Sequence, residues 1–244
     1  MSWPAVSRLQ SVFVISFVGA SLLPNGQASQ STIADAHRLK TGTFFYRTLV
    51  GEKEEGQSKL TIHKNAETDT YVFSADITGA FDQQWESVAE TNMHPVSATL
   101  SFSENGQRKQ SFDLKYAGQR VSGFSAARRN RAARTIDDEV PSDIVDQRID
   151  WATVLAADLK PGTEFSFEVY DPWTGISKAS ARVGPLEHVE VPAGSFEAYR
   201  ITYRIEKNTG AEAYEVLASK EKPRFMVRED FPDGAKAELI RIAP

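Results

Sequence analysis

The fold is decided by the stretch VSATLSFSENGQRKQSFDLKY, which spans residues 96–116. Apolar residues occupy every second position in its two outer parts: Val96, Ala98, Leu100 and Phe102, then Phe112, Leu114 and Tyr116. Asn105-Gly106 lies between the two parts, and this dipeptide favours a tight hairpin turn because both residues tolerate positive φ. The stretch therefore predicts two antiparallel strands that bury one face and expose the other.

The same alternation recurs along most of the chain, with clear examples at residues 71–77, 165–169 and 199–205. Asn208-Thr209-Gly210 and Asp233-Gly234 supply further hairpin turns. Parallel strands are usually covered on both faces and read as continuous apolar runs, so the alternation favours an antiparallel sheet. We expect about seven strands before residue 125 and about six or seven after residue 162.

One segment has helical spacing instead, the stretch PSDIVDQRIDWATVLAADLKPG at residues 141–162. Ser142, Asp143 and Asp146 are candidate N-caps, and Pro161-Gly162 ends the helix. The apolar residues at helical spacing are Ile149, Trp151, Ala152, Val154, Leu155 and Leu159. We predict a helix over about residues 143–158, and because a lone short helix is marginal in water, it must dock on the sheet.

The predicted fold class is mainly β (α+β), a large curled antiparallel sheet or half-barrel of about 13 strands with the helix on its concave face. A flat sheet of that size would be roughly 60 Å wide, whereas one helix covers a strip only about 10 Å across. The apolar face is therefore either buried by closure into a barrel or sandwich, or left as a concave groove. A closed core would be structural, and a groove would bind an apolar ligand.

The N-terminal residues read as a targeting signal. Arg8 precedes a short apolar stretch, SVFVISFVGASLL at residues 11–23, and Gly26-Gln27-Ala28 offers small residues for a signal peptidase. We expect a Sec-type signal peptide over residues 1–28 that is cleaved after Ala28. The remaining residues 29–244, with a polar lead-in at 29–41, would form one periplasmic or secreted domain.

Composition excludes several classes of protein. The 244 residues are 41% hydrophobic and 25% charged, with no cysteine, so disulfides, thiolate metal sites and a cysteine nucleophile are excluded. The formal net charge of −5, together with export, disfavours nucleic acid as a partner. No nucleotide-binding or metal-binding motif occurs, and the four histidines lie far apart in the sequence, at His37, His63, His94 and His188.

The C-terminal part resembles a known family. The segment EVPAGSFEAYRITY at residues 190–203, the following hairpin, and Pro223-Arg224 before a last strand AKAELIRI are similar to the exported bacterial family called domain of unknown function 3108. The opening GTFFYR at residues 42–47 and the stretch from Asp143 to Gly162 also fit, so the resemblance covers nearly the whole chain after residue 28. The acidic stretch 52–55 and the arginine-rich stretch after Phe124 depart from the family. The resemblance implies a β-rich secreted domain, similar in architecture to the half-barrels of periplasmic lipoprotein carriers. It implies no catalytic residues.

Two sets of residues are candidates for binding. The residues expected to line the apolar groove are Trp85, Val96, Leu100, Phe102, Phe112 and Trp151. An arginine-rich crossover loop, predicted over residues 125–141, would either contact the anionic surface of the envelope membrane or be a solvated loop neutralised by Asp137-Asp138-Glu139. Its candidate contact residues are Arg128, Arg129, Arg131 and Arg134.

The leading expectation is a non-enzymatic exported protein, without metal or cofactor, that binds a lipid or another apolar ligand in a concave groove. One alternative is an envelope structural or partner-binding protein with a closed core. A second alternative is a secreted hydrolase whose active site is assembled from residues far apart in the sequence.

Overall fold

Fifteen strands pair edge to edge in one open sheet in the computed structural model, which describes residues 34–79, 82–104, 106–127, 132–207 and 210–243. Their order is β8-β7-β6-β5-β4-β3-β2-β1-β15-β14-β13-β12-β11-β10-β9. All neighbours are antiparallel except β9 and β10. The chain thus runs from the middle of the sheet to one edge at β8, crosses to the opposite edge at β9, and after a helix returns to the middle.

The strands before the helix are β1 (Gly42–Val50), β2 (Lys53–Asn65), β3 (Thr70–Gly79), β4 (Gln83–Glu90), β5 (Pro95–Glu104), β6 (Gln107–Ala117), β7 (Arg120–Ser125), β8 (Arg134–Glu139) and β9 (Val145–Asp146). Those after it are β10 (Glu164–Asp171), β11 (Gly175–Val191), β12 (Gly194–Lys207), β13 (Gly210–Ser219), β14 (Met226–Asp230) and β15 (Ala235–Ala243). A short 3-10 helix, η1, covers Ala36–Arg38.

The predicted hairpin at residues 96–116 is confirmed. Leu100 pairs with Phe112 and Ala98 with Leu114 across β5 and β6, and all four side chains are buried. The structure has the expected seven strands before residue 125 and six after residue 162, together with the two short strands β8 and β9. The predicted mainly-β class is therefore confirmed, with a sheet that does not close on itself.

The segment predicted as a crossover loop over residues 125–141 contains a strand, β8. This strand was missed because Ile136 is its single apolar residue, too few to produce an alternating pattern. Ile136 is buried opposite Gly123 of β7. Gly123 has φ of +142°, and a Cβ there would lie 1.9 Å from the Asp113 carbonyl oxygen, so the close pairing of β6 and β7 requires a glycine.

The helix is shorter than predicted. It consists of a 3-10 turn, η2 (Gln147–Ile149), followed by α1 (Asp150–Ala156). Of the three candidate N-caps, Asp146 caps the turn, because its side chain accepts the Arg148 backbone N–H. The far end is held by Arg224, whose buried guanidinium donates to the carbonyls of Leu155 and Ala157 at 3.2 and 3.0 Å. These contacts take the place of a further helical turn.

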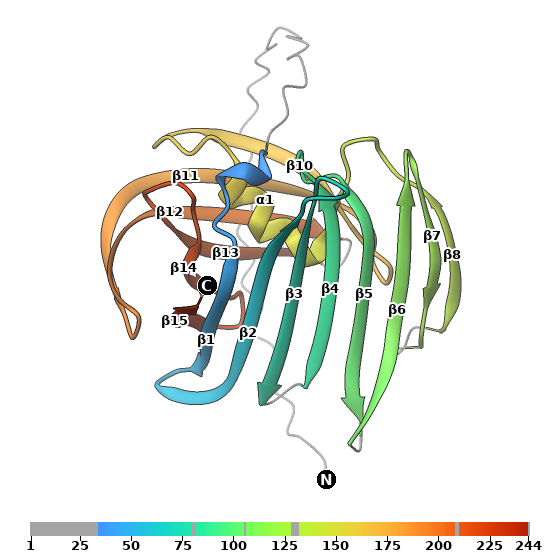
Figure 1. Cartoon of the computed structure of the whole chain (residues 1–244), viewed down its shortest axis with the longest axis horizontal. Helices are drawn as coiled ribbons and strands as arrows, with labels where there is room; N and C mark the ends of the chain where they lie inside the picture. Colours follow the sequence, from blue (N-terminus) through green and yellow to red (C-terminus); the bar gives the residue numbers. More distant parts are fainter. Residues whose placement is uncertain (1–33, 80–81, 105, 128–131, 208–209, 244) are drawn as a thin grey trace, which may run out of the picture. The chain divides into compact units, whose positions relative to one another are not determined.

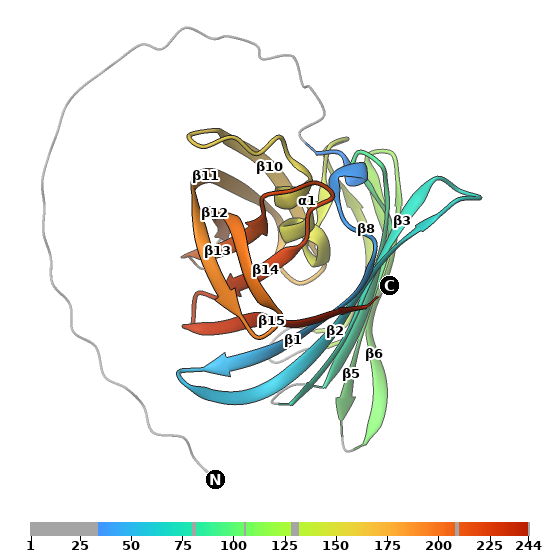
Figure 2. The ribbon, with the colours of Figure 1, turned by 60° about the vertical axis from the view of Figure 1, so that its left-hand side comes forward.

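The sheet curls around this helix. Figure 1 shows β2–β7 side by side as one wall, with β11–β13 running across the view at the level of α1. In Figure 2, α1 lies between β10–β14 on one side and β2–β6 on the other. Every residue of α1 is buried, and its apolar side chains belong to the main hydrophobic core. The expected docking of the helix on the concave face is therefore confirmed.

The two edge strands of the sheet, β8 and β9, are not paired with each other. Side chains link the two ends instead. The Tyr170 hydroxyl of β10 donates to Asp138 of β8 at 2.6 Å, and Arg134 of β8 donates to the carbonyl of Pro172 at 3.2 Å. The sheet is thus a half-barrel whose ends are joined by these hydrogen bonds and by the buried packing of Tyr170 against the core cluster of β5 to β8.

Candidate ligand groove

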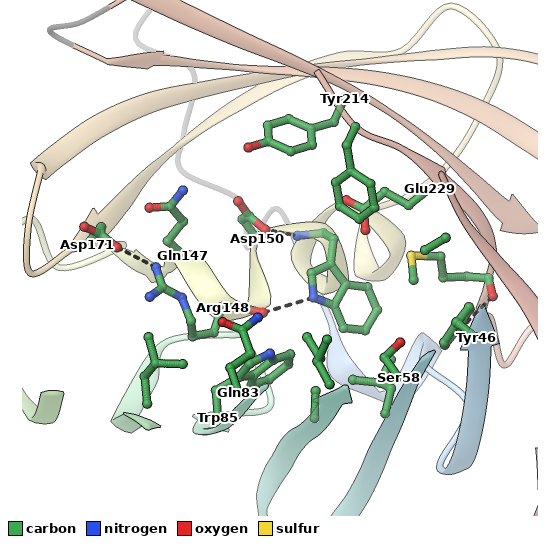
Figure 3. Close-up of a pocket in the computed structure, with 18 of the residues that line it drawn as sticks. Tyr46, Ser58, Gln83, Trp85, Gln147, Arg148, Asp150, Asp171, Tyr214 and Glu229 are labelled. Carbon is green, nitrogen blue, oxygen red and sulfur yellow. Dashed lines mark hydrogen bonds and ion pairs between the residues drawn. The ribbon is translucent and has the colours of Figure 1, made fainter. Parts of the chain in front are cut away.

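A hollow of about 1030 Å³ lies between α1 and the concave face of the sheet. Its apolar lining includes Leu60, Ala75, Ile77, Trp85, Leu100 and Trp151. Its polar lining includes Gln83, Gln147, Arg148, Asp150, Lys207 and Glu229. Figure 3 shows both kinds of side chain directed into the same space. We call this space the groove; it is amphipathic rather than wholly apolar, which corrects the sequence-based expectation.

The groove continues toward the turn between β1 and β2. A second hollow of about 450 Å³ shares with it Thr48, Ile77, Gln83, Tyr214 and Phe231. Its other lining residues include the apolar Val50 and Pro232 and the acids Glu55, Glu212 and Asp233. The two hollows therefore join α1 to this turn through a shared lining.

Three of the six predicted lining residues, Trp85, Leu100 and Trp151, line the groove. Phe112 is fully buried beneath it, in contact with the ring of Trp173 at 5.3 Å and the guanidinium of Arg148 at 5.2 Å. These positions follow from the alternation of β4 and β5 and from the docking of α1.

Phe102 and Val96 also lie outside the groove lining. Phe102 packs beside the core cluster of β5 to β8. Val96 is 38% exposed and borders a separate hollow near η1. In the pairing of β4 with β5, Ser97 and Pro95 each have a partner, whereas Val96 between them has none. This β-bulge turns Val96 out of the alternation that predicted its direction.

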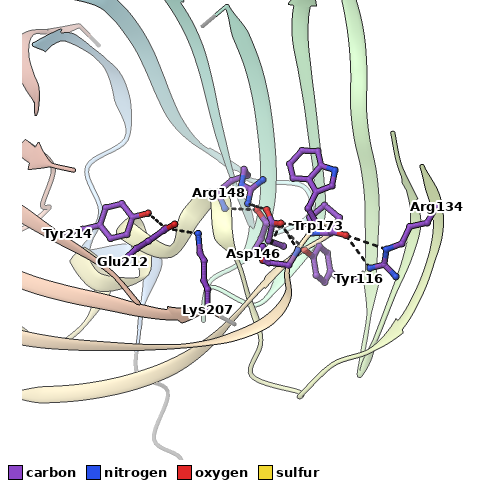
Figure 4. Close-up of polar contacts among 11 residues, drawn as sticks. Tyr116, Arg134, Asp146, Arg148, Trp173, Lys207, Glu212 and Tyr214 are labelled. Atoms are coloured by element: carbon purple, nitrogen blue, oxygen red, sulfur yellow. Dashed lines mark hydrogen bonds and ion pairs between the residues drawn. The ribbon is translucent and has the colours of Figure 1, made fainter. Parts of the chain in front are cut away.

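One end of the groove holds a paired cluster of charges, which Figure 4 shows. Arg148 forms an ion pair with Asp171 at 2.7 Å, and both side chains are almost fully buried. Burial opposes ionisation of Asp171, but the charge and hydrogen bond of Arg148 outweigh it and hold the pKa of Asp171 below its usual range. Burial raises the pKa of the neighbouring Asp146, which accepts the Tyr116 hydroxyl at 2.8 Å.

The middle of the groove holds two acids in a different state. Burial raises the pKa of Asp150 to about 7. Burial, together with the nearby charge of Asp150, raises the pKa of Glu229 to about 8. Glu229 Oε1 accepts the hydroxyl of Tyr203 at 3.2 Å, and Tyr203 stacks on Tyr214 at 4.8 Å. Among the described residues, no cation forms an ion pair with either acid.

Sequence reasoning missed these acids. Asp150 follows a helix start and reads as a charge that suits the helix N-terminus. Glu229 lies in a short strand, MVRED, whose apolar alternation is weak. Asp150, Tyr203 and Glu229 lie on three separate elements, α1, β12 and β14, and only the strand order brings them together. The sequence signal that could have revealed this site was Asp150, the one charged residue in a helix segment that is otherwise apolar except for Thr153.

The arginine-rich segment is placed only in part. Arg128, Arg129 and Arg131 lie outside the described residues. Arg134 forms an ion pair with Asp138 at 2.7 Å in addition to its bond to Pro172, so its guanidinium fastens β8 to the loop after β10. The contacts of Arg134 are thus with its own strand and with the loop after β10.

The four histidines, all described, are absent from the lining of the groove. Within the described ranges, no group of three or more metal-ligating side chains could hold a metal ion. A search of those same residues for a helix with the length and apolar character needed to span a bilayer finds none.

The fold has counterparts among known structures. A β-barrel-like protein of the DUF1849 family from Brucella abortus superposes with a TM-score of 0.53 at 10% identity, covering 84% of this chain and 98% of its own. A candidate exported protein with a YmcC-like fold from Bacteroides fragilis gives a TM-score of 0.34 at 9% identity, over 86% and 100% of the two chains. A candidate lipoprotein from Parabacteroides distasonis gives 0.32 at 11% identity, over 86% and 98%.

No curated protein matches the sequence. The model of a family described as a protein of unknown function, DUF3108, matches residues 36–240, which include the helix and every strand of the described residues except the last three residues of β15. The predicted resemblance over nearly the whole domain is therefore confirmed. The chain belongs to the DUF3108 family.

Proposed function

We propose that this chain is an exported, non-enzymatic protein that binds a lipid or another apolar ligand in the groove between α1 and the concave sheet. The observation that carries the proposal is the groove itself, about 1030 Å³ in volume. Ligand sites of small molecules are of this size and are lined by apolar side chains with a few polar groups. A closed-core structural protein would fill this space with its own side chains.

Binding of a neutral apolar fluorophore, N-phenylnaphthylamine, to the purified protein tests the proposal. Ser58 of β2 lines the groove, so Ser58→Phe should fill part of it and weaken binding of the fluorophore. Thr61 of the same strand lies in a shallow hollow on the opposite face, so Thr61→Phe is the matched control and should bind normally. Equal binding by both variants, or no binding by the unmodified protein, would refute the proposal.

Export is supported by the charged start, short apolar stretch and small-residue site of residues 1–28. Expression of the full chain in a bacterium, osmotic release of the periplasm and N-terminal sequencing test it. The expected product begins at Ser29. Recovery of the intact N-terminus from the cytoplasm would contradict export.

One observation favours the hydrolase alternative: Asp150 and Glu229 keep their protons near neutral pH, as a general acid must. A panel of chromogenic esters and glycosides tests this reading. Turnover that is lost in Glu229→Gln and kept in Glu238→Gln, an acid on the other face of the adjacent strand, would establish it. Absence of turnover across the panel supports the binding protein.

A further inference from the structure

The charges that line the groove are unevenly matched. Its two cations, Arg148 and Lys207, are both already paired, with Asp171 at 2.7 Å and Glu212 at 2.6 Å. Its two central acids, Asp150 and Glu229, have no such partner among the described residues. When these acids are ionised, the unmatched charge of the groove is negative, and a ligand that complements it brings a positive charge or hydrogen-bond donors.

Glu229 is 7% exposed and lines the groove. One of its carboxyl oxygens accepts the Tyr203 hydroxyl, and the described residues give the other oxygen no hydrogen bond. Asp150 is 5% exposed, and within the described ranges its carboxyl accepts only the backbone N–H of Trp151, at 2.6 Å. A buried carboxyl group with so few donors is costly, and a donor from a ligand removes that cost.

The apolar half of the groove lies beside these acids. Figure 3 shows Asp150 and Glu229 on the side of the view that carries Tyr214, with Trp85 and Ser58 on the side below them. Trp85 and Leu100 of the first half of the sheet thus provide an apolar surface, and α1 and β14 provide the acids. A molecule with an apolar body and one donor group satisfies both surfaces at once.

We propose that the groove binds an amphiphilic amine, whose apolar body packs on Trp85 and Leu100 and whose ammonium group donates to Asp150 and Glu229. This inference rests on the proposed function and names its ligand class. A fatty acid of the same length fits less well at a pH where the two acids are ionised, because its carboxylate would meet their like charges.

The test compares three probes of equal chain length, dodecylammonium, dodecanol and dodecanoate, as competitors of N-phenylnaphthylamine on the unmodified protein. It is run near pH 8.5, where the acids are largely ionised and an alkyl amine, with a pKa near 10.4, keeps its charge. We expect dodecylammonium to displace the fluorophore at a concentration at least about tenfold lower than dodecanoate, which corresponds to about 1.4 kcal/mol.

Variants of the two acids test whether they cause the preference for the amine. Asp150→Asn and Glu229→Gln keep the shape of each side chain and remove its charge, so each should reduce the preference for the amine while dodecanol competes as before. Glu238→Gln is the matched control, because Glu238 pairs with Arg47 outside the groove. Circular dichroism and unfolding of each variant check that it is folded, and the comparison of probes on the unmodified protein does not depend on any variant.

Each outcome of this experiment either supports or overturns the inference. Preference for the amine that is lost in both groove variants supports the inference. Equal or stronger competition by dodecanoate overturns it, as does a preference that persists in both groove variants, yet both results leave the groove a binding site for apolar molecules. If neither the fluorophore nor dodecanol binds, the proposed function fails and this inference fails with it.

Discussion

Two regions of the groove wall hold buried acids in opposite electrostatic states. At the η2 and β10 corner, Asp171 is ionised, because Arg148 stabilises its charge. Between α1 and β14, burial raises the pKa of Asp150 to about 7 and that of Glu229 to about 8, and the charges of Arg148 and Lys207 offset this only in part at Asp150. In the first arrangement, a cation of the same chain already pairs with the acid and stabilises the fold, and we call this corner complete. In the second arrangement, neither acid forms an ion pair among the described residues, and we call this region incomplete.

Removing Arg148, the cation of the complete corner, should have the largest effect on the free energy of unfolding. Arg148→Met leaves Asp171 buried without its partner, and breaking a buried ion pair costs about 3–5 kcal/mol in the free energy of unfolding. Urea unfolding monitored by tryptophan fluorescence measures it. Arg120→Met is the control, because Arg120 pairs with Asp137 at the surface and should matter little. A negligible loss in Arg148→Met would show that the corner does not depend on its ion pair.

The incomplete region should govern how stability depends on pH. The unfolded chain releases the Glu229 proton near pH 4.5, whereas the folded protein keeps it to about pH 8. The folded state therefore binds more protons between these values, and the free energy of unfolding falls as pH rises through this window, by about 1 kcal/mol per pH unit. Glu229→Gln should flatten the fall and be the more stable protein near pH 8.

This dependence is measured by urea unfolding at several pH values between about 4 and 9. Glu238→Gln should retain the slope of the unmodified protein, since the carboxylate of Glu238 is already paired with Arg47. A slope of opposite sign in the unmodified protein, with stability rising toward pH 8, would mean that Glu229 is ionised in the folded state.

The smallest effect on the free energy of unfolding is expected on removal of the Tyr203 hydroxyl, which donates to Glu229 in the incomplete region. Tyr203→Phe removes the donor to Glu229 and should cost about 1 kcal/mol of unfolding free energy. It should also raise the pKa of Glu229 further, since this hydrogen bond favours the charged form. The midpoint of the pH dependence then moves upward. Tyr214→Phe removes a hydroxyl that donates to Glu212 instead, and should leave the midpoint unchanged.

Local chemistry made most of the fold predictable. The alternation of Phe112, Leu114 and Tyr116 is confirmed by their burial, and Asp146 caps the helix turn as a short acidic side chain can. The alternating sequence pattern gave wrong predictions where the backbone departs from a regular strand or where a strand has few apolar residues. The bulge at Val96 reverses a side chain without any mark in the sequence pattern, and β8 has too few apolar residues to be recognised.

The groove was predictable in outline and not in chemistry. The mismatch between a wide sheet and a single helix indicated a concave space, and the helix pattern placed Trp151 on its wall. The acids of the groove follow from long-range pairing, because Glu229 reaches Asp150 only through the order of β12 to β14 in the sheet. Neither the spacing of residues along the sequence nor their secondary-structure propensity shows that two residues on different elements lie close together in the fold.

The unpaired edges of the sheet have a mechanical consequence. A closed barrel has a bore set by its number of strands and their stagger, and it widens only by breaking a backbone ladder. Here the ends are fastened by side chains such as Tyr170 and Arg134. The same ends are also held by the buried packing of Tyr170 against the core cluster of β5 to β8. The width of the opening is therefore set by side-chain contacts and not by a backbone ladder.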